Sequence, residues 1–212
     1  MTLAIGVHVP KAGGASLRAA LARHFGPDLF LDYSDRVVDP DSQRQRDPAA
    51  YLRRRDTLPP GTRGVFGHFH PIKYDHLDAT RFTILRHPVD TLIATYFFWL
   101  SQPPTHALHR AVVERELGIR ELANVQSTRH LMSRTYFEGV DMGRFDVIGR
   151  HEERASAITR IAALLGLSEV VGHENPTPGS AQRDEALSDA RLRADLSDLL
   201  SDDIQFYEQW AR

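Results

Sequence analysis

The sequence predicts an α/β fold in which a central, mostly parallel sheet is flanked by helices. Short apolar runs typical of buried strands alternate along the chain with longer stretches whose apolar residues recur at helical spacing. The first run, Leu3 to Val9, leads into a turn with two glycines. A helical pattern then follows, with Leu17, Leu21 and Phe25 on one face. A strand, a tight turn and a helix in this order are the expected first unit of such a sheet.

The remaining elements follow from the same patterns. Further strands are expected over 29–33, 64–70, 81–86 and 145–149. Helices are expected over 89–100, most of 105–138, 152–167, 183–200 and 202–210. The polar stretch 34–62 is interpreted as a solvated loop with a short helix near 48–55, and 172–179 as a loop.

Length and composition limit the possible functions. A chain of 212 residues with 42% hydrophobic and 25% charged residues predicts one globular domain, 1–212. A net charge of −2 argues against a general nucleic-acid binder, and the absence of cysteine excludes disulfides and thiol chemistry. The N-terminus lacks a signal-peptide pattern and no run is long enough to span a bilayer, so a cytoplasmic protein is expected. The oligomeric state stays open.

The turn after the first strand has the chemistry of an anion site. Glycines let backbone N–H groups approach an anion, and the following helix directs its positive end to the same place. Lys11 precedes Gly13 and Gly14, whereas G-x-x-x-x-G-K-[ST] places its lysine after the last glycine. Lys11 is therefore expected at the mouth of the turn. The alternative is an ordinary strand-to-helix turn with a surface lysine.

Two further stretches carry candidate site residues. Alternation along a strand places His68 and His70 on one face, about 7 Å apart. They are candidate metal ligands, structural side chains or a general base, since neutral imidazole accepts a proton near pH 7. Arg86 stands at a strand end beside a helix that starts at Pro88, where α/β folds collect ligands. A solvated arginine is the alternative.

Taken together, these segments resemble the PAPS-dependent sulfotransferases, in particular the carbohydrate branch with the heparan sulfate 2-O-sulfotransferases and bacterial relatives. His8-Val9-Pro10-Lys11-Ala12-Gly13-Gly14-Ala15-Ser16-Leu17 is similar to the 5′-phosphosulfate loop H-I-P-K-T-G-G-T-S-L. Arg86-His87-Pro88-Val89-Asp90, followed by Tyr96-Phe97-Phe98, is similar to the 3′-phosphate motif R-D-P-V-x-R-x-x-S-x-Y-x-F. Gly67-His68 and the terminal pairs Asp203-Ile204 and Tyr207-Glu208 also match.

The resemblance implies a P-loop-type three-layer fold and PAPS as the donor, with no metal. It implies that the backbone of Ala12, Gly13, Gly14, Ala15 and Ser16 holds the 5′-phosphate and that Arg86 holds the 3′-phosphate. Lys11 would neutralise charge on the bridging oxygen, and His68, or else His70, would be the base of an in-line transfer.

The chain also departs from the family pattern. Ala12 and Ala15 replace threonines, His87 replaces an acid, and the motif serine falls at Ala94, with Thr95 as the candidate replacement. A helical insertion of about 103–140 would shape the site of a small-molecule or glycan acceptor, with Gln126 and Arg129 as candidate contacts. A loop around Asn175 is a candidate cover for the adenine. A small-molecule P-loop kinase using Mg-ATP and a non-catalytic nucleotide-binding relative are the alternatives.

Overall fold

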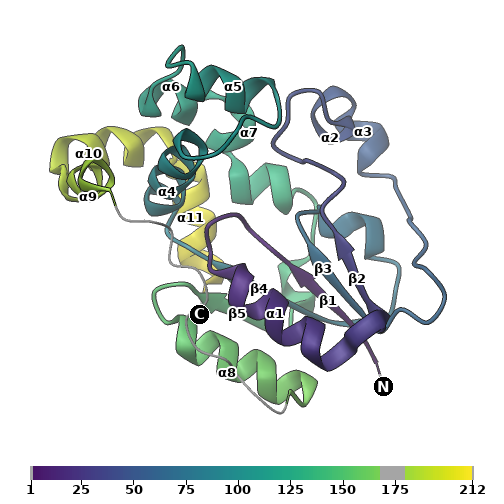
Figure 1. Cartoon of the computed structure of the whole chain (residues 1–212). Helices are drawn as coiled ribbons and strands as arrows, with labels where there is room; N and C mark the ends of the chain where they lie inside the picture. Colours follow the sequence, from purple (N-terminus) through teal and green to yellow (C-terminus); the bar gives the residue numbers. More distant parts are fainter. Residues whose placement is uncertain (1, 168–179, 212) are drawn as a thin grey trace.

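The computed structural model describes residues 2–167 and 180–211, built on a five-stranded parallel sheet in the order β2-β3-β1-β4-β5 (Figure 1). The strands are β1 (Leu3–Val7), β2 (Leu29–Asp32), β3 (Gly64–Gly67), β4 (Ala79–Leu85) and β5 (Val147–Arg150). β1 pairs in parallel with β3 and β4, which places it at the centre. All five strands therefore end at the same edge of the sheet. The predicted α/β fold with a parallel sheet flanked by helices is confirmed.

The helices next to the sheet bury the apolar faces that the sequence indicates. α1 (Gly14–Phe25) packs on β2 and β3 through Leu17, Leu21 and Phe25, and α8 (Arg154–Leu165) packs on β4 and β5 (Figure 1). The π-helix η3 (Leu131–Tyr136) and α11 (Ser201–Trp210) pack on each other and join the same core. Short 3₁₀ turns lie at Gly26–Asp28, Pro71–Tyr74 and Met142–Arg144.

A second apolar cluster lies beyond the strand ends. It joins α4 (Pro88–Leu100), α5 (Ala107–Val113), α6 (Ile119–Asn124) and α10 (Ala190–Leu199). The short α7 (Gln126–Arg129) connects this layer to η3, and α9 (Ala181–Ser188) packs on α4. Figure 1 shows these helices grouped at one end of the sheet. Among the described residues, none of the helices has the length and apolar character of a membrane span.

Several predicted elements are shorter than the sequence indicates. The predicted strand 64–70 ends at Gly67, and a 3₁₀ turn follows from Pro71. The helical stretch 105–138 is divided into four short pieces, and 183–200 is divided at Asp189, whose side chain caps α10. The predicted loop 172–179, with Asn175, lies outside the described residues.

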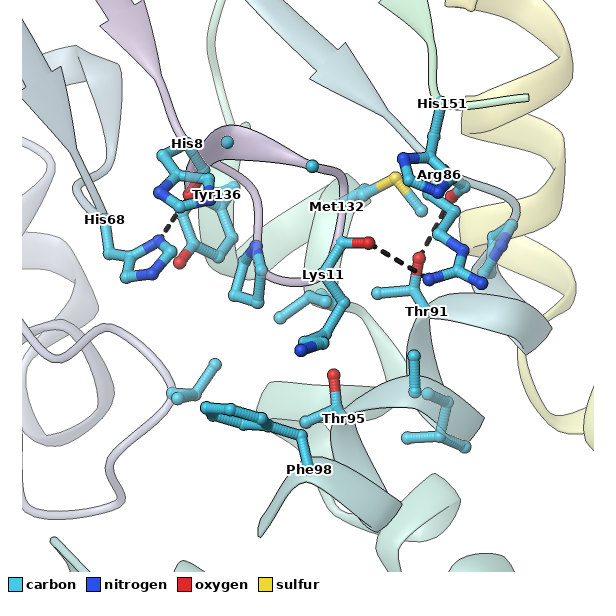
Figure 2. A pocket seen from close by; sticks show the side chains of 18 of the residues that line it. His8, Lys11, His68, Arg86, Thr91, Thr95, Phe98, Met132, Tyr136 and His151 are labelled. Carbon is cyan, nitrogen blue, oxygen red and sulfur yellow. Dashed lines mark hydrogen bonds between the residues drawn. The ribbon is translucent and has the colours of Figure 1, made fainter. Parts of the chain in front are cut away.

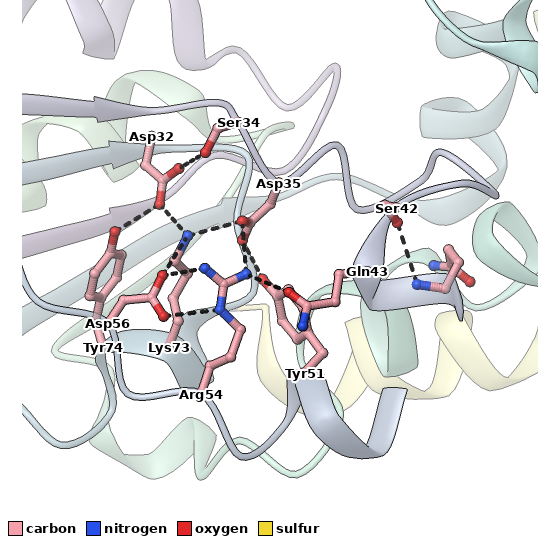
Figure 3. Close-up of polar contacts among 11 residues, drawn as sticks. Asp32, Ser34, Asp35, Ser42, Gln43, Tyr51, Arg54, Asp56, Lys73 and Tyr74 are labelled. Carbon is pink, nitrogen blue, oxygen red and sulfur yellow. Dashed lines mark hydrogen bonds and ion pairs between the residues drawn. The ribbon is translucent and has the colours of Figure 1, made fainter. Parts of the chain in front are cut away.

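The polar stretch 34–62 contains the predicted short helix, α3 (Pro48–Tyr51), and most of its residues are exposed or half-buried, but ion pairs also fix it to the sheet. Lys73 is buried and forms ion pairs with Asp32 (2.7 Å), Asp35 (3.0 Å) and Asp56 (3.5 Å) (Figure 3). Arg54 lies between Asp35 and Asp56 and binds both. The ion pairs fasten the stretch to the end of β2 and to the turn at Lys73. They hold the chain beside Tyr33, the residue that follows β2.

Candidate functional site

A cavity of about 1530 Å³ opens where the strands end (Figure 2). The residue that directly follows each strand lines it: Tyr33 after β2, His68 after β3, His8 after β1, Arg86 after β4 and His151 after β5. Ligands of parallel α/β folds bind at this edge of the sheet. The topology therefore brings Lys11, His68 and Arg86 to one cavity, although 75 residues separate Lys11 from Arg86 in the chain.

The loop between β1 and α1 has the backbone shape of an anion cradle. Lys11 has φ 60° and Gly13 has φ 87°, with Ala12 at negative φ between them. Alternating left- and right-handed residues direct successive N–H groups to one point, which is the geometry of an anion-binding nest. Gly13 also precedes the first residue of α1, and no side chain caps this helix. The amides of its first turn therefore face the same region as the nest.

Packing also explains the two glycines. A Cβ on Gly14 would lie 2.1 Å from the imidazole of His8, and a Cβ on Gly13 would lie 2.7 Å from Cδ of Arg154. Gly13 additionally needs its positive φ. His8 and Arg154 thus enclose the loop from two sides, and any side chain at either glycine would displace it.

Lys11 occupies the centre of the cavity wall. Figure 2 shows it between His68 and Arg86, with Nζ 3.9 Å from the centre of the Phe98 ring. Nη1 of Arg86 donates a hydrogen bond of 3.1 Å to the Lys11 carbonyl, so the arginine supports the loop directly. Burial, followed by the charges of Arg86 and Arg183, lowers the pKa of Lys11 from 10.5 to about 8. The region is therefore rich in positive charge and suited to an anion.

The turn that carries Arg86 is tied to the C-terminal helix. The backbone N–H of His87 donates to Oε1 of Glu152 at 3.0 Å, and the hydroxyl of Tyr207 donates to Oε2 of the same carboxylate at 2.7 Å. Thr91 Oγ1 donates to the Arg86 carbonyl at 3.2 Å. Through Glu152, Tyr207 of α11 thereby helps to hold the turn that carries Arg86 in place.

Thr95 carries a buried hydroxyl that fits an anionic ligand. The residue lines the cavity, is 8% exposed, and its Oγ1 has no hydrogen-bond partner among the described residues. A buried hydroxyl without a partner costs about 1–3 kcal/mol, so native proteins usually satisfy it. Ala94, also on the wall, offers only a methyl group. A phosphate oxygen at this position would supply the partner that Thr95 lacks.

His68 lies in the cavity as a neutral imidazole of defined tautomer. Its Nδ1 is hydrogen-bonded to the His8 carbonyl, and because a carbonyl only accepts, Nδ1 carries the proton and Nε2 the lone pair. Burial lowers the pKa of His68 to about 4, and the bond to His8 opposes this shift only in part. At neutral pH Nε2 can therefore accept a proton from a hydroxyl group.

His8 and Tyr33 support His68, and no sequence pattern identifies either residue in this role. The His8 ring stacks on that of His68 at 4.3 Å, and its Nδ1 is 3.0 Å from the Tyr33 hydroxyl. Tyr33 also meets the His68 ring edge-on at 4.8 Å and has a hydrogen bond to Arg18. Residues that follow three neighbouring strands, β2, β3 and β1, thus make one packed group. Only the strand order brings them together.

His70 is not part of the cavity, which corrects its choice as the second candidate base. It is fully buried, its Nδ1 accepts the N–H of Ile72 at 3.2 Å, and its ring lies 6.0 Å from that of Tyr51. Because β3 ends at Gly67, strand alternation does not extend to position 70 and the two histidines do not share a face. Burial, followed by the charge of Arg44, lowers the pKa of His70 to about 3.

Gln126 and Arg129 are also outside the cavity, which corrects their choice as acceptor contacts. Gln126 is exposed, and Arg129 Nε donates to the Leu199 carbonyl at 3.1 Å. Thr128, Leu131 and Met132 from the same region line the wall instead. The helix expected over 105–138 is interrupted here, so a single helical face does not predict which residues point inward.

The sequence patterns do not identify three further basic residues of the cavity wall. Arg154 and Arg183 join Lys11 and Arg86 there, together with His151, whose pKa is lowered by burial and by the charge of Arg86. His151 and Arg154 follow β5, and their position after a strand is the signal that would have identified them. No group of three or more His, Asp or Glu side chains suited to a metal ion occurs in residues 2–167 and 180–211.

Two solved structures are similar to this chain at low sequence identity. No family model matches the sequence, and no curated protein matches it. The crystal structure of a sulfotransferase from Alicyclobacillus acidocaldarius is 21% identical, covers 97% of this chain and 96% of that chain, and has a TM-score of 0.42. The mouse sulfotransferase SULT7A1, complexed with PAP, is 14% identical, with 88% of this chain and 65% of that chain covered and a TM-score of 0.39. Similarity at this level does not establish a shared activity.

Proposed function

We propose that this protein is a sulfotransferase that moves a sulfuryl group from PAPS to a hydroxyl group of a carbohydrate or glycoconjugate. The observation that carries the proposal is the convergence of three chemistries on one cavity: the cationic nest at Lys11, the guanidinium of Arg86 and the neutral imidazole of His68. The family resemblance of the motifs around these residues supplies the identity of the donor.

The residues present fit a nucleotide with two phosphate groups. The amides of residues 12–16 would hold one phosphate, and Arg86 with the Thr95 hydroxyl would hold the other. PAPS supplies the activated sulfuryl group when bound. Lys11 then stabilises negative charge at the cavity centre, and Nε2 of His68 takes the proton of the acceptor hydroxyl. Lys11, His68 and Arg86, to which these functions are assigned, all line the same cavity (Figure 2).

Aromatic side chains of the cavity wall support a hydroxyl substrate with apolar faces. Tyr33, Phe98, Trp99 and Tyr136 line the cavity together with His106. Aromatic rings pack against the apolar faces of sugar rings as they do against other apolar groups, and the imidazole adds polar contact. A sugar hydroxyl is therefore the acceptor class that we propose.

A thermal-shift titration tests the nucleotide assignment. Adenosine 3′,5′-bisphosphate (PAP), the product nucleotide, is compared with ADP, each with and without magnesium. A ligand at about 100 times its Kd stabilises the folded state by about 2.7 kcal/mol. PAP is expected to raise Tm without magnesium, and Arg86→Ala is expected to abolish most of that rise.

The same titration separates the proposal from its alternatives. A magnesium-dependent response to ADP alone would indicate a kinase. A response to PAP without [³⁵S]sulfate transfer from PAPS to any hydroxyl in a panel of sugars and phenols would indicate a binding protein. Arg160→Ala, which changes an arginine of α8 that does not line the cavity, is the matched control for charge.

A further inference from the structure

The side chain of Phe98 lies directly under the ammonium group of Lys11. Nζ is 3.9 Å from the ring centre, well within the range of about 6 Å for a cation–π interaction. The contact joins the loop after β1 to α4. Lys11 and Phe98 are 87 positions apart in the sequence. Figure 2 shows the two side chains pointing toward each other across the cavity.

The backbone of Lys11 is held in place, whereas its long side chain can change conformation. A non-glycine residue at φ 60° is held by its surroundings, and here the Arg86 guanidinium binds the Lys11 carbonyl at 3.1 Å. Lysine has a flexible stem of four carbons and a compact charge. A group that restrains the ammonium therefore determines the position of the positive charge in the cavity.

The Phe98 ring is suited to hold this charge reversibly. Phe98 lines the cavity and is 36% exposed. The cation–π interaction of Lys11 with the ring is modest in energy. A charge-assisted hydrogen bond from Lys11 to a phosphate or sulfate oxygen is stronger, so an incoming anion can draw the ammonium from the ring. Burial and the charges of Arg86 and Arg183 oppose protonation of Lys11, and the ring favours it.

We propose that Phe98 is a positioning residue for Lys11: its ring holds the ammonium at the centre of the cavity and presents it to the donor anion. This inference rests on the proposed sulfuryl transfer, because that reaction gives Lys11 its task. It assigns to Phe98 a function that neither the motif resemblance nor the sequence pattern assigns.

The chain offers a direct measurement, because Lys11 and Lys73 are its only lysines. Protein labelled with [¹³C]lysine gives two Cε signals, and Lys73, buried in its ion pairs, is the internal reference. Phe98→Leu keeps an apolar side chain but removes the π face. The expected result is a fall of roughly 0.4–1 unit in the pKa of Lys11, from the cation–π contribution. Phe98→Tyr, which keeps the ring, is expected to restore the wild-type titration.

Kinetics supply the second readout. Phe98→Leu is expected to lower kcat for transfer from PAPS about 3- to 10-fold, while Kd for PAP changes less than 2-fold. Phe97→Leu, the neighbouring change in the second apolar cluster, is expected to leave the Lys11 titration unchanged. An unaltered Lys11 pKa in Phe98→Leu would overturn the inference. If the wild type transferred no sulfate, the proposed function would fail, and the titration would still decide whether Phe98 holds Lys11.

Discussion

The hydroxyl of Thr95 provides a test in which stability and binding are expected to change in opposite directions. Its Oγ1 is buried without a partner among the described residues, and Thr95→Val replaces it with a methyl group of similar shape. Removing an unsatisfied hydroxyl recovers part of a penalty of about 1–3 kcal/mol. A gain of about 1 kcal/mol raises Tm by roughly 2–4 °C in a chain of this size.

The same substitution is expected to weaken the nucleotide complex. A hydrogen bond to a charged phosphate oxygen contributes about 1.5–3 kcal/mol, which corresponds to roughly a 10- to 150-fold increase in Kd for PAP. Differential scanning calorimetry measures the first effect and isothermal titration calorimetry the second. The two measurements together distinguish a hydroxyl that binds a ligand from one that is only a structural imperfection.

Thr91 is the matched control on the same helix. It is one turn earlier, is buried, lines the cavity and donates its hydroxyl to the Arg86 carbonyl. Thr91→Val therefore removes a satisfied hydrogen bond and is expected to lower Tm by roughly 2–4 °C, for a loss of about 1 kcal/mol. If Thr95→Val also lowered Tm, or left PAP binding unchanged, Thr95 would not be a phosphate contact.

Three further outcomes are expected. Affinity for PAPS should fall as the pH rises above about 8, because the Lys11 ammonium, whose pKa is lowered to about 8, then loses its charge; Lys11→Ala should remove this pH dependence in binding titrations. His68→Gln should reduce transfer by roughly 10²- to 10⁴-fold and leave PAP binding within a factor of two, and an equal loss of both would refute the assignment of His68 as the base. Gly14→Ala should lower Tm, since the new Cβ would lie 2.1 Å from the His8 ring, at a cost of about 1–3 kcal/mol for overpacking; an unchanged Tm measured by calorimetry would contradict the tight packing.

The sequence predicts the part of the site that depends on local pattern and on the direction of the strands. A buried run followed by a polar residue marks a strand end, and parallel strands bring all their ends to one edge. Lys11, His68 and Arg86 are found in one cavity for this reason. The sequence does not predict the strand order, which places β3 between β2 and β1. The contact of His8 with Tyr33 depends on that order and could not be inferred.

Errors in element length account for the misplaced residues. Strand alternation predicts His70 on the face of His68, but the chain turns after Gly67, and the buried His70 ring caps the turn at Pro71. The prediction that Arg129 faces the cleft depends on a mainly helical stretch over 105–138. The π-helix η3 that follows changes the direction of the side chains, and Asp203 accepts hydrogen bonds from the N–H groups of Met132 and Ser133 in it.

The departures from the family motif are consistent with a binding site that relies on backbone groups. Ala12 is 2% exposed, so a threonine there would bury a further hydroxyl that needs a partner. The alternating conformation of Lys11, Ala12 and Gly13 presents N–H groups without such a requirement. On α4 the methyl group of Ala94 cannot bind a phosphate, whereas the next residue, Thr95, carries a hydroxyl that lacks a partner. Thr95 is therefore the candidate on α4 to replace the hydroxyl that Ala94 lacks, and the paired valine substitutions test that assignment.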